Sequence, residues 1–245
     1  MDNSTAMSGT PRPRLILFPV PLSVGEPGRV LPQLNLELLR SVRHFVVEDL
    51  RSARRFLRSV SREIVIDELS LTELNEHTPA SEVEAMLAPM EQGHDLGVLS
   101  EAGCPAVADP GADLVAAAQR RGYDVVPLVG PSSIILSLMA SGFNGQSFTF
   151  HGYLPVEPQA RTAVLREIER DVRRHRRTHI FIETPYRNNR LIAEIVKTLP
   201  GDMLLCVASD ITGQRQDIRT RRLRDWADLS RYDYSKIPTI FLLYS

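Results

Sequence analysis

The sequence predicts an α/β protein with two α/β domains, whose sheets are mainly parallel or mixed. Residues 96–142 alternate apolar runs of strand length with amphipathic segments of helix length, in the order strand, loop, helix, strand, loop, helix. The 245 residues, 43% of them hydrophobic, can bury one large core or two smaller ones. The segment Pro155–Pro158 carries two prolines and indicates a hinge, so we expect the domain boundary near it.

The N-terminal domain is expected over residues 14–150. Residues 1–13 lack the apolar core of a secretory signal, and we expect a flexible tail there. Apolar spacing and turn residues then predict the elements of the domain. In order, they are strand 15–20, helix 31–42, strand 44–48, helix 50–60, strand 63–69, helix 79–93, strand 96–99, helix 112–121, strand 123–129, helix 134–140 and strand 147–154.

The C-terminal domain is expected over residues 151–245. It starts with a strongly charged helix whose apolar stripe and Glu–Arg pairs have helical spacing. The expected elements are helix 160–177, strand 179–183, helix 186–199, strand 203–209 and strand 238–243. Residues 215–224 form an arginine-rich run to which the pattern assigns no element.

Charge and cysteine content favour a cytoplasmic protein. The net charge is −1, so the chain has no global basic field. No run approaches the roughly 18 apolar residues that a membrane span needs, so no membrane association is expected. The two cysteines form no CxxC motif, and reduced thiols are the default for such a chain. No metal-ligand spacing such as HExxH occurs, so no metal site is expected.

Two loops, residues 100–111 and 130–133, each follow an expected strand. Both contain Gly and Pro, which let the backbone turn sharply and expose N–H and C=O groups. Parallel sheets bind ligands at the carboxyl ends of their strands, so main chain alone could hold a small polar ligand here. The loops match neither GxGxxG nor GxxxxGK[ST], which disfavours a dinucleotide or a P-loop nucleotide. A tight structural turn is the alternative interpretation.

Arginine dominates the basic residues, with 27 arginines among the 29 basic side chains. Arginine suits bidentate contacts with phosphate, although a base-composition bias in the coding DNA gives the same result. Spacing places Arg51, Arg55, Arg58 and Arg62 on one helical face, which could meet a phosphate backbone or be a solvated face. Residues 173–177 form a second basic cluster, with the same two interpretations.

The segment SEAGCPAVADPG, followed by VVPLVGPSSIILSLMASG, resembles the SDAGTP…DPG and VxPLPGPSA motifs of the tetrapyrrole methylase superfamily. Within it, the chain is most similar to the 16S rRNA ribose (cytidine) 2′-O-methyltransferase family. The resemblance extends over about residues 14–245. It implies S-adenosylmethionine (SAM) as cofactor, held in a cleft between two α/β domains. It also implies ribosomal RNA or the small ribosomal subunit as partner, and a homodimer.

The resemblance also implies site residues, position by position. In the first loop, Pro19, Pro21 and Leu22 match the family, but the family's GNLxD portion is replaced. Cys104 stands in a family Thr position, which implies a backbone contact with SAM and no reactive thiol. The SAM-binding residues implied are Pro21, Leu22, Ser100, Gly103, Cys104, Val107, Ser132, Ser133, Ile134, Ile182, Ala208 and Pro238.

Methyl transfer to a hydroxyl needs a group that takes up the proton. Three carboxylates are the candidates: Glu48, Glu101 and Glu183. Alternatively, Asp49 beside Glu48 caps the helix at 50–60, and Glu183 caps the helix that follows it.

Three functions stay open on the sequence alone. The first is a methyltransferase of ribosomal RNA, which the arginine runs favour. The second is a SAM enzyme acting on a small molecule or a protein. The third is a SAM-binding module without catalysis. The altered first loop and the early end of the chain favour the second and third.

Overall fold

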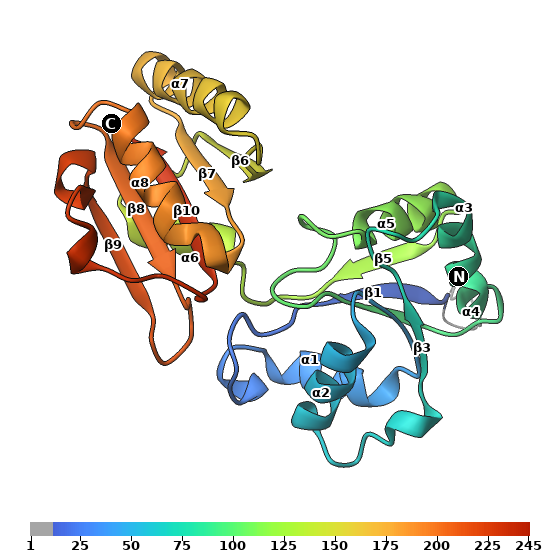
Figure 1. Ribbon diagram of the computed structural model, residues 1–245. Helices are drawn as coiled ribbons and strands as arrows, with labels where there is room; N and C mark the ends of the chain where they lie inside the picture. Colours follow the sequence, from blue (N-terminus) through green and yellow to red (C-terminus); the bar gives the residue numbers. More distant parts are fainter. Residues whose placement is uncertain (1–11) are drawn as a thin grey trace, which may run out of the picture. The chain divides into compact units, whose positions relative to one another are not determined.

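The computed structural model describes residues 12–245, so the expected tail at 1–13 lies almost wholly outside the described residues. The chain forms two units (Figure 1). The first comprises the chain up to Pro21 and Gly25–Pro131, and the second comprises Leu22–Val24 and Ser132–Ser245. No helix within residues 12–245 has both the length and the apolar character to cross a membrane.

The first unit is built on a five-stranded parallel sheet of order β3-β2-β4-β1-β5. Its strands are β1 (Arg14–Phe18), β2 (His44–Val47), β3 (Ser70–Glu73), β4 (Leu96–Leu99) and β5 (Asp124–Pro127). Its helices are α1 (Gln33–Ser41), α2 (Leu50–Val60), α3 (Ala80–Val83), α4 (Ala88–Glu91) and α5 (Gly111–Arg120), with 3-10 turns η1 (Pro27–Arg29), η2 (Ile66–Glu68) and η3 (Glu84–Leu87).

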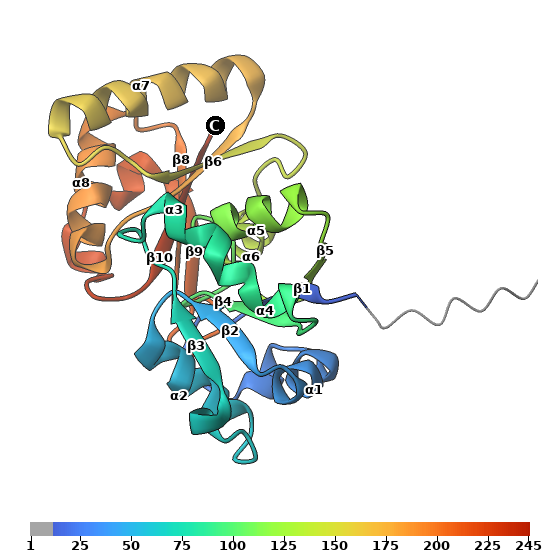
Figure 2. The same ribbon diagram turned by 90° about the vertical axis from the view of Figure 1, so that its right-hand side faces the viewer.

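Helices cover both faces of this sheet (Figures 1 and 2). Successive side chains of a strand point to opposite faces, so they pack against different helices. Phe18, Phe45 and Val47 pack in one core cluster with α1 and α2. Leu17 and Val46, their neighbours in sequence, pack in the other cluster with α3 to α5. Both faces are covered, which explains why the inner strands β1, β2 and β4 are apolar runs without polar alternation.

The second unit has a mixed five-stranded sheet of order β6-β7-β10-β8-β9. Only β6 and β7 pair in parallel. The strands are β6 (Phe148–Tyr153), β7 (Thr178–Ile182), β8 (Leu204–Ser209), β9 (Asp217–Arg222) and β10 (Thr239–Tyr244). The helices are α6 (Ser133–Ser141), α7 (Pro158–His175) and α8 (Asn188–Thr198), with 3-10 turns η4 (Pro185–Arg187), η5 (Leu223–Trp226) and η6 (Leu229–Arg231).

The second sheet also lies between two helical layers. Phe181, Val207 and Phe241 pack with α7 and α8 on one face. Ile180 and Ala208 pack with α6 on the other. The predicted class, two α/β units with parallel or mixed sheets, is confirmed by this architecture and by the related folds reported below.

The division of the chain falls at Pro131/Ser132, earlier than the boundary expected between residues 150 and 151. The hinge prolines are not the dividing point, because α6 and β6 pack with the second sheet. Leu138 of α6 lies in the cluster with Ile180, and β6 pairs with β7.

Two local predictions were wrong, and one strand was not predicted. The strand expected at 63–69 is a 3-10 turn whose Ile66 packs under α2, and the real edge strand starts at Ser70 with little apolar signal. The helix expected at 79–93 is broken into α3, η3 and α4, because Pro89 lacks an N–H and its ring crowds the preceding turn. The arginine-rich run contains the edge strand β9, which pairs with β8 through backbone groups.

Candidate functional site

The loops that follow β1 and β4 leave the first sheet at its topological switch point. These strands are neighbours, but the chain continues from β1 to β2 on one side and from β4 to β5 on the other. In open α/β sheets, ligands bind outside the carboxyl ends of the strands at such a point. Here the central loop, residues 100–110, lies beside the start of the first loop, residues 19–21, since Gly103 pairs with Val20.

Direct contacts join three strand-end loops of the first unit. Val20 and Gly103 exchange two main-chain hydrogen bonds of 2.9 Å. The Cys104 Sγ lies 3.5 Å from the carbonyl oxygen of Pro131, in the loop after β5. A Cβ on Gly130 would lie 2.2 Å from the Cβ of Pro19, so only glycine allows the close approach of these two loops.

The central loop contains three residues with left-handed backbone. The φ angles are 78° at Gly103, 65° at Ala106 and 57° at Ala108. A residue with a Cβ pays about 1–2 kcal/mol for this conformation. The Asp109 Oδ1 accepts the N–H of Ala106 at 3.2 Å and that of Gly111 at 2.5 Å, which fixes the loop. Strained backbone held in this way is typical of functional sites.

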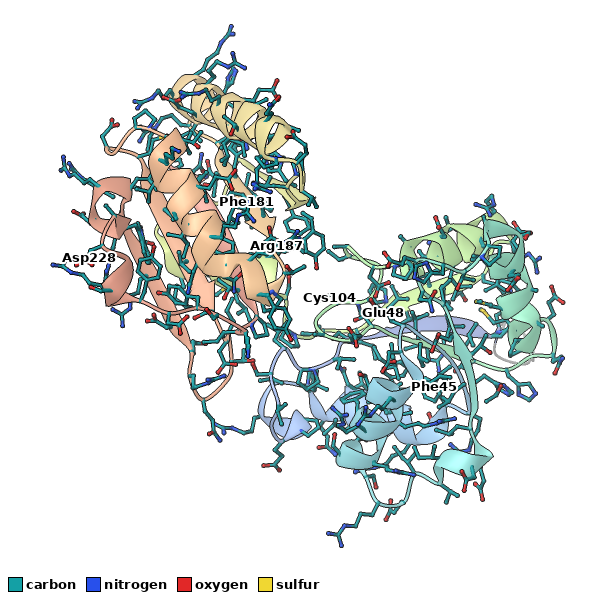
Figure 3. The ribbon with its side chains drawn as sticks, in the orientation of Figure 1. Phe45, Glu48, Cys104, Phe181, Arg187 and Asp228 are labelled. Atoms are coloured by element: carbon teal, nitrogen blue, oxygen red, sulfur yellow. The ribbon has the colours of Figure 1, made fainter. Side chains whose placement is uncertain are left out.

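Glu48 and Glu101 meet at this edge of the sheet. The Glu48 Oε2 accepts the Glu101 N–H at 2.9 Å, and the Glu48 N–H donates to the carbonyl oxygen of Leu99. Burial raises the pKa of Glu48, and the nearby charge of Asp109 adds to this rise, against the opposing hydrogen bond from Glu101. Glu101 itself is exposed. Figure 3 labels Glu48 and Cys104 in the first unit.

Asp49 and Cys104 have structural explanations. Asp49 accepts the Ser52 N–H at 2.7 Å, which confirms that it caps α2. Burial raises the pKa of the Cys104 thiol, so the thiol stays protonated and is a poor nucleophile. Of the remaining first-unit candidates, Ser100 is buried, Pro21 is half-buried and Val107 is 49% exposed.

In the second unit, four predicted residues share one apolar cluster. Leu22, Ile134 and Ile182 are partly buried against a group that contains the buried Ala208. Ile182 and Ala208 both pair with Ile240, from opposite sides of β10. Seven of the implied SAM-binding residues lie in the second unit, and these four are neighbours. Of the other three, Ser132 caps α6, Ser133 is the first residue of that helix, and the carbonyl oxygen of Pro238 accepts the Asp210 N–H.

Asp210 organises the end of this sheet and was missed as a partner of the first loop. Its Oδ1 accepts the Ser23 hydroxyl at 2.7 Å, and its Oδ2 accepts the Arg215 N–H at 2.8 Å. Its own N–H donates to the carbonyl oxygen of Pro238 at 2.9 Å. Ser23 and Asp210 are 187 residues apart, and no local pattern signals their contact.

Glu183 is held by an ion pair. Its Oε1 accepts the Thr184 N–H at 2.6 Å and lies 2.7 Å from a terminal nitrogen of Arg187, a residue labelled in Figure 3. The helix-cap interpretation of Glu183 is wrong, because Arg187 occupies the N-cap position of α8 and no side chain caps this helix.

The fold and these strand-end loops define a two-unit α/β protein suited to hold a small polar ligand. The family model of the tetrapyrrole (corrin/porphyrin) methylases matches residues 30–227. The ribosomal RNA small subunit methyltransferase I of Vibrio cholerae is 32% identical over 211 residues, which are 86% of this chain and 68% of the relative. Its Pseudomonas aeruginosa counterpart is 29% identical, over 86% of this chain and 72% of the relative.

A solved structure, the methyltransferase CobJ, has the same fold, with a TM-score of 0.63 and 16% identity over 95% of this chain and 93% of that one. The uroporphyrin-III-C-methyltransferase of Thermus thermophilus gives a TM-score of 0.55 and 17% identity, over 95% of this chain and 92% of that one. The chain belongs to the tetrapyrrole methylase family. It is a methyltransferase that uses SAM, as the resemblance implied.

The chemistry of both units fits this cofactor. SAM carries a carboxylate, an amine, ribose hydroxyls and a flat purine, so it needs both polar and apolar partners. The first unit offers the constrained main chain around Gly103 and the exposed carboxylate of Glu101. The second unit offers the partly buried apolar side chains of Leu22, Ile134 and Ile182.

Proposed function

We propose that this enzyme methylates a ribose 2′-hydroxyl of small-subunit ribosomal RNA. The alignment carries the proposal, since relatives named ribosomal RNA small subunit methyltransferase I match 86% of the chain. The constrained loops at the switch point support it from the structural side. The GNLxD portion of the family's first loop is replaced in this chain, and Ser23 of this loop donates a hydrogen bond to Asp210.

We propose the SAM-binding residues in two groups. Pro21, Ser100, Gly103, Cys104 and Val107 belong to the first unit, where they lie on the joined loops. The second-unit group is Leu22, Ser132, Ser133, Ile134, Ile182, Ala208 and Pro238. Bound SAM supplies an activated methyl group, so the protein has to align the acceptor, exclude water and remove a proton.

Glu48 is our proposal for the proton acceptor. It is half-buried beside the central loop, and its raised pKa makes it a stronger base than an exposed carboxylate. Glu101 donates its N–H to Glu48, and we assign it a supporting role in holding that carboxylate. Glu183 shares its Oε1 between Thr184 and Arg187, and we assign it a positioning role in its own unit.

The decisive experiment measures transfer of labelled methyl from SAM to small ribosomal subunits taken from a strain that lacks this ribose methylation. We expect label in the ribosomal RNA, at one ribose that resists alkaline cleavage. Subunits from the parent strain are the control, because their site is already filled. Label in a protein or small-molecule fraction instead would support the second function. SAM binding without any transfer would support a module that lacks catalysis.

Replacing Glu48 with glutamine should lower kcat about 10²- to 10⁴-fold, the usual contribution of a general base, with SAM affinity nearly unchanged. The pKa of Glu48 is raised in the folded state, so the ionised form costs stability as pH rises through this pKa. The variant should therefore be slightly more stable than the parent at pH 7 and should lose the acid limb of the pH–rate profile. An unchanged kcat, measured with subunits as substrate, would remove Glu48 from the reaction.

We also propose that the enzyme is a cytoplasmic homodimer. The resemblance supports a dimer, and so do the apolar side chains of Ile135 and Met139 on α6, which are 46% and 74% exposed and one turn apart. Free cysteines at 104 and 206 are consistent with a reducing compartment. Light scattering of the purified protein would give the mass of the particle.

A further inference from the structure

One helix of the first unit, α2, carries four arginines on its exposed side. Arg51, Arg54, Arg55 and Arg58 of α2 are all exposed, and we call these four residues the arginine face. Helical spacing places them opposite the buried side of α2, which packs into the core through residues 53, 56 and 57. Within residues 12–245, the four side chains form no ion pair and no hydrogen bond.

The arginines of α7 differ from the arginine face, because several of them pair with carboxylates of the same unit. On α7, Arg166 and Arg173 both pair with Glu169, and Arg173 also reaches Asp202. Asp171 pairs with Arg177 just beyond the helix. The basic cluster at 173–177 is thus partly neutralised within the protein. The α2 helix contains no acidic residue. The carboxylate of its N-cap residue, Asp49, accepts a hydrogen bond from the Ser52 N–H.

The arginine face works against the stability of its own helix. Its members are spaced by three and four residues, so neighbouring guanidinium groups repel one another. Arg51 also lies in the first turn, where the helix dipole disfavours positive charge. Arg62, which sequence spacing placed on the same face, follows the helix end at Val60 and is not part of it. The four guanidinium groups are therefore available to an external anion, which would offset their mutual repulsion.

The start of α2 also touches the candidate site. Leu50 follows Glu48 and Asp49 directly, and the Ser52 hydroxyl lies 3.4 Å from Glu101 Oε1. The 11 residues of α2 extend about 16 Å from this point, enough for several successive phosphates. A polyanion lying along the arginine face would therefore reach the loops that we assign to SAM.

We propose that the arginine face binds the phosphate backbone of the RNA substrate and leads the target nucleotide to the central loop. This inference rests on the proposed function, because it takes RNA as the acceptor. Arginine is suited to the task, since its planar guanidinium contacts phosphate oxygens in pairs. Phosphate contacts of this kind position a nucleic acid without reading its sequence.

The test compares two variants that remove the same charge. In the first, Arg51, Arg54, Arg55 and Arg58 become glutamine, and in the matched control Arg166, Arg170, Arg173 and Arg174 of α7 become glutamine. We measure binding of a small-subunit RNA transcript at several salt concentrations, together with KM and kcat on small subunits and SAM affinity by calorimetry. The α2 variant should bind RNA at least 100-fold more weakly. The slope of log K against log[salt] should fall by about 3, since each lost phosphate contact removes roughly 0.7–0.9.

For the α2 variant, KM for subunits should rise while SAM affinity stays at the parent value. Equal losses in both variants would show that bulk charge is responsible and would overturn the proposal. Unchanged RNA affinity and KM in the α2 variant, with the parent active on RNA, would overturn the arginine face alone. A parent enzyme that neither binds nor methylates RNA would overturn the proposed function and the arginine face with it. Binding of the arginine face to phosphatidylglycerol vesicles, with RNA binding unaffected, would also contradict the proposal.

Discussion

Replacing Gly97 with alanine is expected to destabilise the first unit by about 2–3 kcal/mol, and valine should prevent its folding. Gly97 is in β4, between β1 and β2. A Cβ here would lie 2.5 Å from Phe45 Cδ1 and 3.1 Å from Phe18 Cε2. The two rings meet across the glycine, with centroids 6.0 Å apart, and both are fully buried. Neither ring can move without displacing its own neighbours, because a close-packed core has little free volume.

The two units allow this effect to be localised. The single tryptophan, Trp226, is buried in the core of the second unit, so its fluorescence reports unfolding of that unit. Urea unfolding of Gly97→Ala followed by circular dichroism should show an early transition that Trp226 fluorescence does not. Gly25→Ala is the control, since nothing lies within 4 Å of a Cβ at Gly25. The double variant Gly97→Ala/Phe45→Leu should recover part of the loss. An unfolding curve of Gly97→Ala identical to that of the parent would contradict this account of the core.

The strands that are buried on both faces could be predicted from the sequence, because each is a short apolar run. The strands β1, β2 and β4 are covered on both faces, so nearly all their residues are apolar and their positions follow from the sequence. The edge strands β3 and β9 are held by backbone pairing and carry mostly exposed side chains. They have no apolar pattern from which to predict them.

The turn of the central loop could be predicted from the sequence, because Gly and Pro restrict or free the backbone in known ways. Gly and Pro mark the central loop, and the loop indeed turns through left-handed residues at Gly103 and Ala106. Contacts between distant residues could not be predicted. The hydrogen bond from Ser23 to Asp210 depends on how the second sheet is assembled, and no spacing rule encodes it. The short-range pair of Glu183 and Arg187 was visible as two residues four apart, but its ion pair excludes the cap role that helix rules suggested.

Replacing Gly103 with valine should weaken SAM binding at least 100-fold, about 2.7 kcal/mol. Gly103 has a φ of 78°, a conformation in which a β-branched residue is a steric outlier. Both main-chain groups of Gly103 bond to Val20, so any change in its backbone shifts the first loop as well as the central loop. The variant thus alters the two joined loops to which we assign the cofactor, while both sheets keep their cores.

Strain alone would also lower stability, so the experiment needs a variant with equal strain elsewhere. Gly122 provides it, since its φ is 71° and a Cβ there meets nothing within 4 Å. It lies in the turn between α5 and β5, before β5 begins. Gly103→Val and Gly122→Val should lose similar stability in urea, and only Gly103→Val should lose SAM affinity by calorimetry. Gly103→Asn should retain part of the binding, because asparagine tolerates left-handed backbone better than other residues with a side chain. If both valine variants bind SAM like the parent, or both lose binding equally, the central loop does not hold the methyl donor.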